Sequence, residues 1–264
     1  MLRQRVLSSL VLVPIVFAAI WFGDPWFTAL VCVVALLGAI EFHSLVGRDR
    51  WQPLTVVGAI WSVLFVLNVH SENSQTTAML LTSAVVVSLL CSLLVRPRGE
   101  RVFVSWSWTL AGILYLGWLL SYWVLLMKGY HRDWVYLAIF STFAVDTSAY
   151  FVGRALGKHK LAPRISPNKT WEGAVGGVLG GMAAVVVLAL ILGLDIGYAK
   201  LVFIGFMVGL FAQLGDLAES KLKRSTGVKE SGNLIPGHGG ILDRVDSVVF
   251  TGVVVYYCLA WFVV

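Results

Sequence analysis

Long apolar stretches occupy most of this chain, and they constrain its fold more than any other feature. A helix needs about 20 largely apolar residues to cross a bilayer. Only 13% of the residues are charged, whereas soluble domains carry about 25%. The sequence therefore predicts an all-α, polytopic integral membrane protein with about nine transmembrane helices. We expect these at residues 6–22, 26–46, 54–69, 77–95, 104–127, 134–152, 171–192, 201–217 and 245–264.

The basic residues test this count, because short cytoplasmic loops are enriched in lysine and arginine. With a cytoplasmic N-terminus and nine alternating helices, 17 of the 20 basic residues fall on the cytoplasmic side. Only Lys128, Arg132 and Lys200 fall outside. We therefore expect a multi-pass protein of the cytoplasmic (inner) membrane with its N-terminus inside. The asymmetry also accounts for the net charge of +6, so no nucleic-acid partner is expected.

Few polar residues in the first half call for a chemical role. Cys32 and Cys91, together with Cys258 in the second half, are far apart within apolar segments, which is typical of small core residues and not of metal ligands. The basic and apolar N-terminus is interpreted as a retained first helix. Glu41 and His43, near the inner end of the second helix, are interpreted as structural, although a role in lining a cavity stays open.

Polar clusters become frequent after residue 140. Four of them, at 141–154, 164–173, 213–225 and 235–247, fall on the side predicted to face the cytoplasm. The sequence thus predicts an N-terminal scaffold of transmembrane helices over 1–130. Residues 131–264 are predicted to form a transmembrane catalytic region whose site faces the cytoplasm.

The cluster at 213–225 places acids and a base on one helical face. Asp216, Glu219, Ser220 and Lys223 recur at helical spacing. An acid at the end of an apolar helix is costly to place there, which indicates a function for Asp216. A surface ion pair is the alternative for Glu219 and Lys223.

Three further aspartates lie at predicted helix ends on the same side. They are Asp146, Asp243 and Asp246. Carboxylates that converge repel one another, and a divalent cation removes this repulsion. Their hard oxygen atoms suit Mg²⁺ or Mn²⁺, which often arrives with substrate phosphates. A helix cap is the alternative role for Asp243.

Other residues suit the binding of phosphate. Ser166, Asn168 and Lys169 precede a predicted helix start, where free N–H groups favour anions. Glycines flank His238 and allow backbone amides to turn toward an anion. The basic residues nearby are also explained by the cytoplasmic enrichment described above. Together these residues predict a site for metal and phosphate, where a nucleotide or polyphosphate meets a lipid.

The segment SKLKRSTGVKESGNLIPGHGGILDRVD, residues 220–246, resembles the signature of phosphatidate cytidylyltransferases. The segments DTSAYFVGR, SPNKTWEG and GDLAESKLKR are also similar to recurrent parts of that family, so the resemblance covers about residues 141–250. One position departs from the pattern, since Lys229 is followed by Glu230 where the family has aspartate.

The resemblance implies a reaction of CTP with phosphatidate in the membrane that gives CDP-diacylglycerol and pyrophosphate. It implies Mg²⁺, or Mn²⁺, as cofactor, with a second cation and a homodimer left open. It also implies roles for individual residues. Asp216 and Asp243, then Asp246 and Asp146, would bind metal; Lys169, Lys223, Arg224 and Lys229 would neutralise phosphate; His238, Gly239 and Gly240 would shape the phosphate loop; Arg244 would hold the lipid phosphate or a carboxylate; Ser166 and Asn168 would contact substrate.

Two other functions fit such a composition less well. A CDP-alcohol phosphotransferase would carry aspartates at four-residue spacing after D-G and A-R, and that pattern is absent from the sequence. An ion-coupled transporter would place its acids near the bilayer midplane in matched halves. Here the polar groups gather toward one face and the two halves are dissimilar.

Overall fold

The computed structural model describes residues 2–45, 53–71, 73–94, 101–237 and 239–262. It divides into two compact units. The first comprises Met1–Leu125 together with Glu230–Arg244, and the second comprises Leu126–Lys229 together with Val245–Val264. Each unit is therefore built from two separate stretches of chain.

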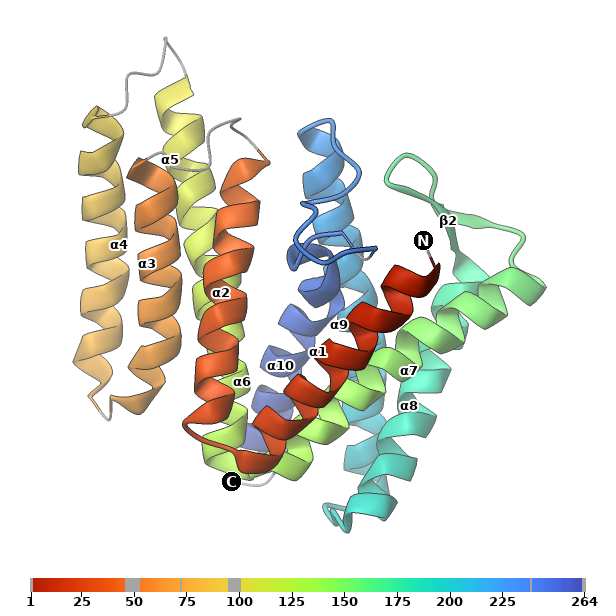
Figure 1. The fold of residues 1–264 in the computed structure, drawn as a ribbon. Helices are drawn as coiled ribbons and strands as arrows, with labels where there is room; N and C mark the ends of the chain where they lie inside the picture. The colour runs from red at the N-terminus through yellow and green to blue at the C-terminus, as the bar shows by residue number, and fades with distance from the viewer. Residues whose placement is uncertain (1, 46–52, 72, 95–100, 238, 263–264) are drawn as a thin grey trace. The chain divides into compact units, whose positions relative to one another are not determined.

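The first unit is an all-helical bundle (Figure 1). The Phe42 ring stacks on the Trp108 ring with 4.8 Å between centroids, and the Trp108 indole donates a hydrogen bond to the Phe42 carbonyl. Phe65, Ala84 and Ile113 form a second apolar core. The unit contains α1 (Leu2–Phe22), α2 (Trp26–Ser44), α3 (Pro53–Leu67), the 3₁₀ turn η1 (Asn68–His70), α4 (Ser74–Leu94), α5 (Arg101–Gly112) and the π-helical segment η2 (Ile113–Trp118).

The second unit packs helices through small residues. A Cβ atom at Gly209 would lie 2.7 Å from the Val178 Cα, so α8 and α9 approach at backbone distance there. A two-stranded antiparallel sheet joins α7 to α8. The unit contains α7 (Arg132–Leu156), β1 (Lys160–Ala162), β2 (Ser166–Thr170), α8 (Trp171–Leu192), α9 (Tyr198–Ser225) and most of α10 (Leu242–Phe262), while α6 (Leu119–Tyr130) joins the two units.

Most of the predicted transmembrane helices are present. Within the described residues, seven helices are long and apolar enough to cross a membrane, and two apolar helices, Leu10–Phe22 and Leu54–His70, are shorter. The all-α, multi-pass prediction is confirmed, whereas the count of nine and the side of the N-terminus stay predictions. Three predicted helix ends, residues 46, 95 and 263–264, lie outside the described residues.

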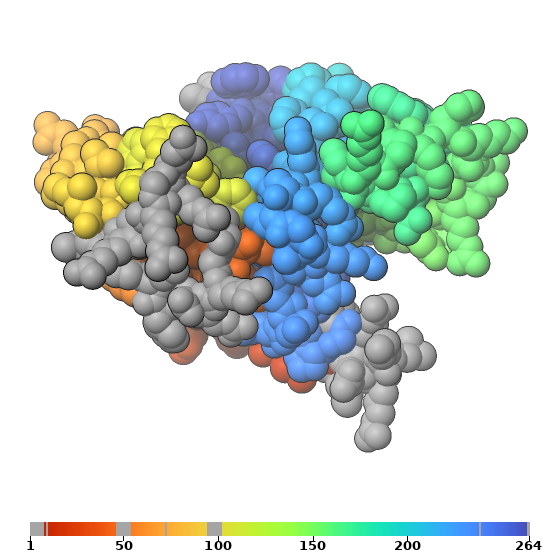
Figure 2. All heavy atoms as spheres, turned by 90° about the horizontal axis from the view of Figure 1, so that it is seen from above, coloured from red at the N-terminus to blue at the C-terminus, as the bar shows by residue number. Residues whose placement is uncertain are grey.

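Two elements differ from the sequence-based expectation. Residues 166–170, predicted as a turn, form the strand β2, because they pair with β1 across a short loop. Helix α9 extends to Ser225, beyond the apolar span predicted to end at 217, and its polar end carries the residues 216–223 that were expected on one helical face. The segment that follows α9 lies at the molecular surface and is drawn in blue in Figure 2.

Candidate active site

The C-terminal part of α9 carries the helical face predicted from the sequence. The Lys223 Nζ lies 2.6 Å from the Glu219 Oε2 one turn earlier. The ion pair is formed, but it is not a surface pair, because Glu219 is fully buried and the Lys223 side chain is only 11% exposed. A buried pair of this kind depends on both partners, since removal of one leaves an uncompensated charge.

Asp216, one turn before Glu219, pairs with a lysine from the hairpin. The Lys169 Nζ lies 2.6 Å from the Asp216 Oδ2, and both side chains are about three-quarters buried. The Ser220 hydroxyl donates to the Asp216 Oδ1 at 3.2 Å. The strand β2 therefore brings Lys169, which is distant in sequence, into contact with α9.

The end of β2 is fixed by the start of α8. The Thr170 Oγ1 accepts a hydrogen bond from the Gly173 amide at 3.1 Å and so caps α8. Such a cap satisfies one of the free amides of the first helical turn. Because Lys169 immediately precedes the capping residue, its backbone position is set by the helix start.

Two more aspartates belong to the same cluster. Asp246, in the first turns of α10, interacts electrostatically with Asp216, Glu219 and Asp146. Asp146, on α7, interacts with both Asp216 and Lys169, and the Ser247 side chain bonds to it. Carboxylates from α7, α9 and α10 thus share one region of the second unit, with the Lys169 ammonium among them.

Other predicted substrate residues lie on the hairpin and just after α9. The exposed Arg224 donates from Nε to the Ile165 carbonyl at 3.4 Å and from Nη1 to the Val228 carbonyl at 3.1 Å. Arg224 therefore ties the hairpin to the turn after α9. Ser166 is half-buried, and Asn168 and Lys229 are exposed, which leaves these side chains accessible to a ligand.

The glycine-rich part of the signature, within residues 230–244, belongs to the first unit. Asp243 Oδ2 accepts hydrogen bonds from the Ser231 amide, the Ser231 hydroxyl and the Gly240 amide, at 3.0, 3.0 and 2.9 Å. These bonds close the loop onto the start of α10. Gly239 adopts a positive φ of 84°, a conformation that favours glycine.

The remaining signature residues have different environments. Arg244, in the first turn of α10, is exposed. His238, predicted to shape a phosphate loop, lies outside the described residues. Asp243 and Arg244 belong to the first unit, and Asp246 belongs to the second. The roles predicted for these residues stay predictions.

The acidic cluster has the oxygen donors that a divalent cation needs, but its carboxylates are not arranged around a common point that a cation could occupy. Hard carboxylate oxygens are the ligands that Mg²⁺ prefers. In the described part of the chain, however, no group of three or more His, Cys, Asp or Glu side chains is arranged to hold a metal ion. Lys169 compensates Asp216 in this arrangement. A cation here would need additional oxygen donors, such as substrate phosphates.

Two contacts of the signature loop were not anticipated from the sequence. Glu41, from α2, accepts hydrogen bonds from Ser231 and from the Leu242 amide. An acid near the end of an apolar helix was the available signal for Glu41, whereas Ser231 had none, because its role depends on the loop conformation.

His43 is packed against Gly58 and bonds to the Ala39 carbonyl, in agreement with a structural role. Cys258 is buried, whereas Cys32 and Cys91, also predicted as core residues, are half-buried.

Known proteins of one family match the chain over almost its full length. The Bacillus subtilis (strain 168) protein named phosphatidate cytidylyltransferase is 31% identical, over 99% of this chain and 98% of its own. A Synechocystis protein of the same name is 33% identical, over 96% and 95%. A Staphylococcus saprophyticus protein of that name is 36% identical, over 81% and 84%. Since the model of the cytidylyltransferase family also matches residues 3–262, the chain belongs to the cytidylyltransferase family.

Proposed function

We propose that this chain transfers the cytidylyl group of CTP to phosphatidate in the membrane, giving CDP-diacylglycerol and pyrophosphate. Family membership and the name shared by its relatives support this reaction. The observation that carries the proposal at the level of the site is the Lys169–Asp216 pair beside Asp146 and Asp246. This cluster combines groups that attract phosphate with groups that attract a cation.

The reaction needs charge compensation more than a protein nucleophile. A phosphate oxygen of phosphatidate attacks the α-phosphorus of CTP, and the bond to the pyrophosphate leaving group breaks. Lys169 and Lys223, together with the exposed Lys229, would neutralise the triphosphate and the developing negative charge. Preorganised positive groups of this kind stabilise the transition state of phosphoryl transfer and so raise its rate.

Asp216, Asp246 and Asp146 are proposed to hold Mg²⁺ or Mn²⁺ together with the substrate phosphates. A bound divalent cation would polarise the phosphate oxygens and stabilise the leaving group. Asp243 was also predicted as a ligand, and its Oδ2 already accepts three hydrogen bonds from the signature loop. We therefore assign Asp243 first to the shape of that loop.

This cluster is proposed to face the cytoplasm, where CTP is available, and the distribution of the basic residues supports this orientation. The exposed Arg244 is proposed to meet the lipid phosphate, and Ser166, Asn168 and Arg224 to contact the nucleotide. The three aspartates of the cluster and Lys169 come from one chain, so the proposed chemistry does not need a homodimer.

One assay tests the proposal and separates it from the alternatives. Purified protein in detergent micelles should release pyrophosphate only when CTP, Mg²⁺ and phosphatidate are all present. A CDP-alcohol phosphotransferase would instead consume a CDP-lipid and release CMP, and a transporter would release neither product. Failure to form CDP-diacylglycerol from active, folded preparations would refute the proposal.

The variant Asp246→Asn refines this test. It replaces one carboxylate oxygen of the cluster by an amide and should reduce turnover by about 100-fold or more, as expected when a group that stabilises the transition state is lost. The matched control is Asp195→Asn, which removes an exposed carboxylate before α9 and should keep wild-type activity. Equal activity of the two variants would exclude a catalytic role for Asp246.

A further inference from the structure

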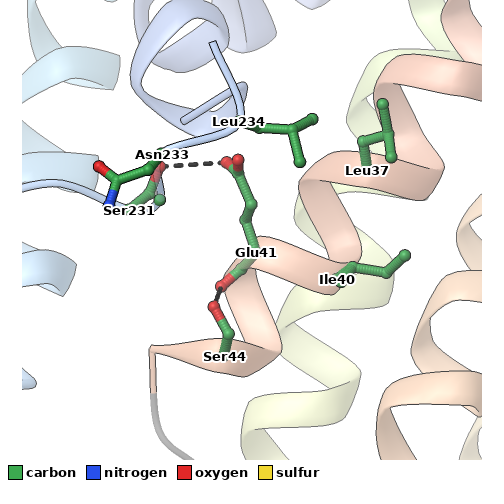
Figure 3. Close-up of a pocket in the computed structure, with 8 residues that line it drawn as sticks. Leu37, Ile40, Glu41, Ser44, Ser231, Asn233 and Leu234 are labelled. Carbon is green, nitrogen blue, oxygen red and sulfur yellow. Dashed lines mark hydrogen bonds between the residues drawn. The ribbon is translucent and has the colours of Figure 1, made fainter. Parts of the chain in front are cut away.

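The Glu41 carboxylate of α2 is buried in the first unit, where it receives the signature loop. Glu41 is only 6% exposed. Its Oε2 accepts a hydrogen bond from the Ser231 hydroxyl at 3.1 Å and another from the Leu242 amide at 2.9 Å. Figure 3 shows the Glu41 side chain directed from α2 toward Ser231. One acid from the second helix thus binds both the beginning and the end of the loop at 231–242.

The loop is shaped to admit this carboxylate. A Cβ atom at Gly232 would lie 2.8 Å from the Glu41 Oε1, and a Cβ atom at Gly240 would collide with the Glu41 Oε2 and the Ser231 hydroxyl. Larger residues at these two positions would force the loop away from α2. The two glycines therefore let the backbone approach the carboxylate on both sides.

The same contacts extend to Asp243, the signature acid in the first turn of α10. The Ser231 hydroxyl lies 3.1 Å from the Glu41 Oε2 and 3.0 Å from the Asp243 Oδ2. The Ser231 and Gly240 amides also donate to Asp243. Ser231 therefore connects Glu41 to Asp243, and a shift of the loop away from α2 would change the hydrogen bonds that hold Asp243.

The space beside Glu41 is too small for a substrate. The pocket lined by Leu37, Glu41, Ser44 and the residues 231–234 has a volume of about 30 Å³. By the same measure, a cavity of about 10–15 Å³ already holds one water molecule, so this pocket has room for about two or three. Glu41 consequently does not contact CTP or a lipid headgroup at this pocket, and its effect on the reaction must pass through the loop.

We infer that Glu41 is a positioning residue, which holds the 231–242 loop and through it Asp243 in the arrangement needed for activity. The expected effect of Glu41 on turnover rests on the proposed function, whereas its contact with the loop does not. Helix α2, in the N-terminal region, would then hold part of the signature segment in its active conformation.

The test combines hydrogen exchange with kinetics on the full-length protein in detergent. In Glu41→Ala, the amides of Ser231, Gly240 and Leu242 should exchange faster by about 10- to 100-fold, the factor for losing hydrogen bonds to a charged acceptor. The ratio kcat/KM for CTP should fall in parallel. Glu41→Gln keeps an oxygen that can accept from Ser231 and Leu242, so it should restore part of both losses. The control Asp195→Asn should change neither.

Two results would overturn the inference. One is unchanged exchange of these amides in Glu41→Ala. The other is faster exchange with wild-type kinetics, because the loop would then not need this anchor. If Glu41→Ala does not fold, Ser231→Ala and the double variant Ser231→Ala/Glu41→Gln decide the matter. The loss of kcat/KM in the double variant should be smaller than the sum of the losses in Ser231→Ala and in Glu41→Gln. A double-variant loss equal to that sum would contradict the connection between the two residues.

Exchange is measured without substrate, so it separates this inference from the proposed function. A protein whose loop loosens as expected, but which forms no CDP-diacylglycerol even as wild type, would refute the proposed reaction and leave the anchoring contact established.

Discussion

At the scale of single residues, Lys169 joins the hairpin to the acidic cluster. Lys169→Ala should lower kcat by about 100-fold or more, because one ammonium then no longer compensates the phosphates and Asp216. Initial rates of pyrophosphate release measure the effect. Lys160→Ala, on the neighbouring strand, removes an exposed charge of the same kind and should leave kcat within about twofold. Comparable losses in both variants would point to a general effect of surface charge.

The sequence predicted the residues of this cluster better than their contacts. Asp146, Lys169, Asp216 and Asp246 were singled out from helix-end position and neighbouring polarity, and the structure brings them into one region. The direct pairing of Lys169 with Asp216 was not predictable, since it depends on a strand whose partner is set by tertiary packing. Burial of the Glu219–Lys223 pair was missed for the same reason.

At the scale of elements, the cap of α8 should control how firmly Lys169 is held. Thr170→Val keeps the shape of the side chain and loses the acceptor for the Gly173 amide, which should cost about 1 kcal/mol of stability. The thermal midpoint in detergent should fall by about 2–4 °C. Thr170→Ser retains the hydroxyl and should stay close to wild type. An unchanged midpoint in Thr170→Val would show that the cap is dispensable.

The contact between α8 and α9 gives a second prediction at this scale. Gly209→Ala puts a methyl group against the Val178 backbone, and overpacking of this kind costs about 1–3 kcal/mol. Gly129→Ala, in α6, meets no atom within 4 Å and should be neutral or stabilising, because alanine favours helices. The free energy of unfolding in detergent distinguishes the two variants. Equal values would mean that α8 and α9 can move apart at little cost.

Helices were predictable from the sequence because each apolar run is long compared with its breaks. The helix 171–192 has the predicted bounds, while the apolar span predicted for α9 covers only part of that helix, and the helical spacing of residues 216–223 indicated the rest. Hydropathy reports the apolar length of a helix, and it does not report a polar extension that keeps helical hydrogen bonds. The short hairpin carries no strong strand pattern and was missed.

At the scale of the whole molecule, the distribution of basic residues predicts which face meets the cytoplasm. In a background without Cys32, Cys91 and Cys258, a cysteine at position 200 should react with an impermeant maleimide in intact cells. A cysteine at position 160 should react only after the cells are opened. Both positions are exposed in the structure, so burial does not decide the outcome. The reverse labelling pattern would invert the predicted topology.

The two units were not predictable as they stand. A division of role near residue 130 was expected from the onset of polar clusters and stays a prediction. In the structure, the first unit combines Met1–Leu125 with Glu230–Arg244, and the latter stretch lies in sequence between the two parts of the second unit. The reason is Glu41, whose contacts with Ser231 and Leu242 have no signature in either segment alone.

The length of α9 has a consequence for how the rate would depend on lipid. Its 28 residues span about 42 Å, whereas the hydrocarbon layer is about 30 Å thick. The last turns can therefore reach headgroup depth, where a lipid phosphate can meet them by lateral diffusion without leaving the bilayer. Turnover would then follow the mole fraction of phosphatidate in the micelle or bilayer. Diluting the surface with inert lipid at constant bulk concentration would slow the enzyme.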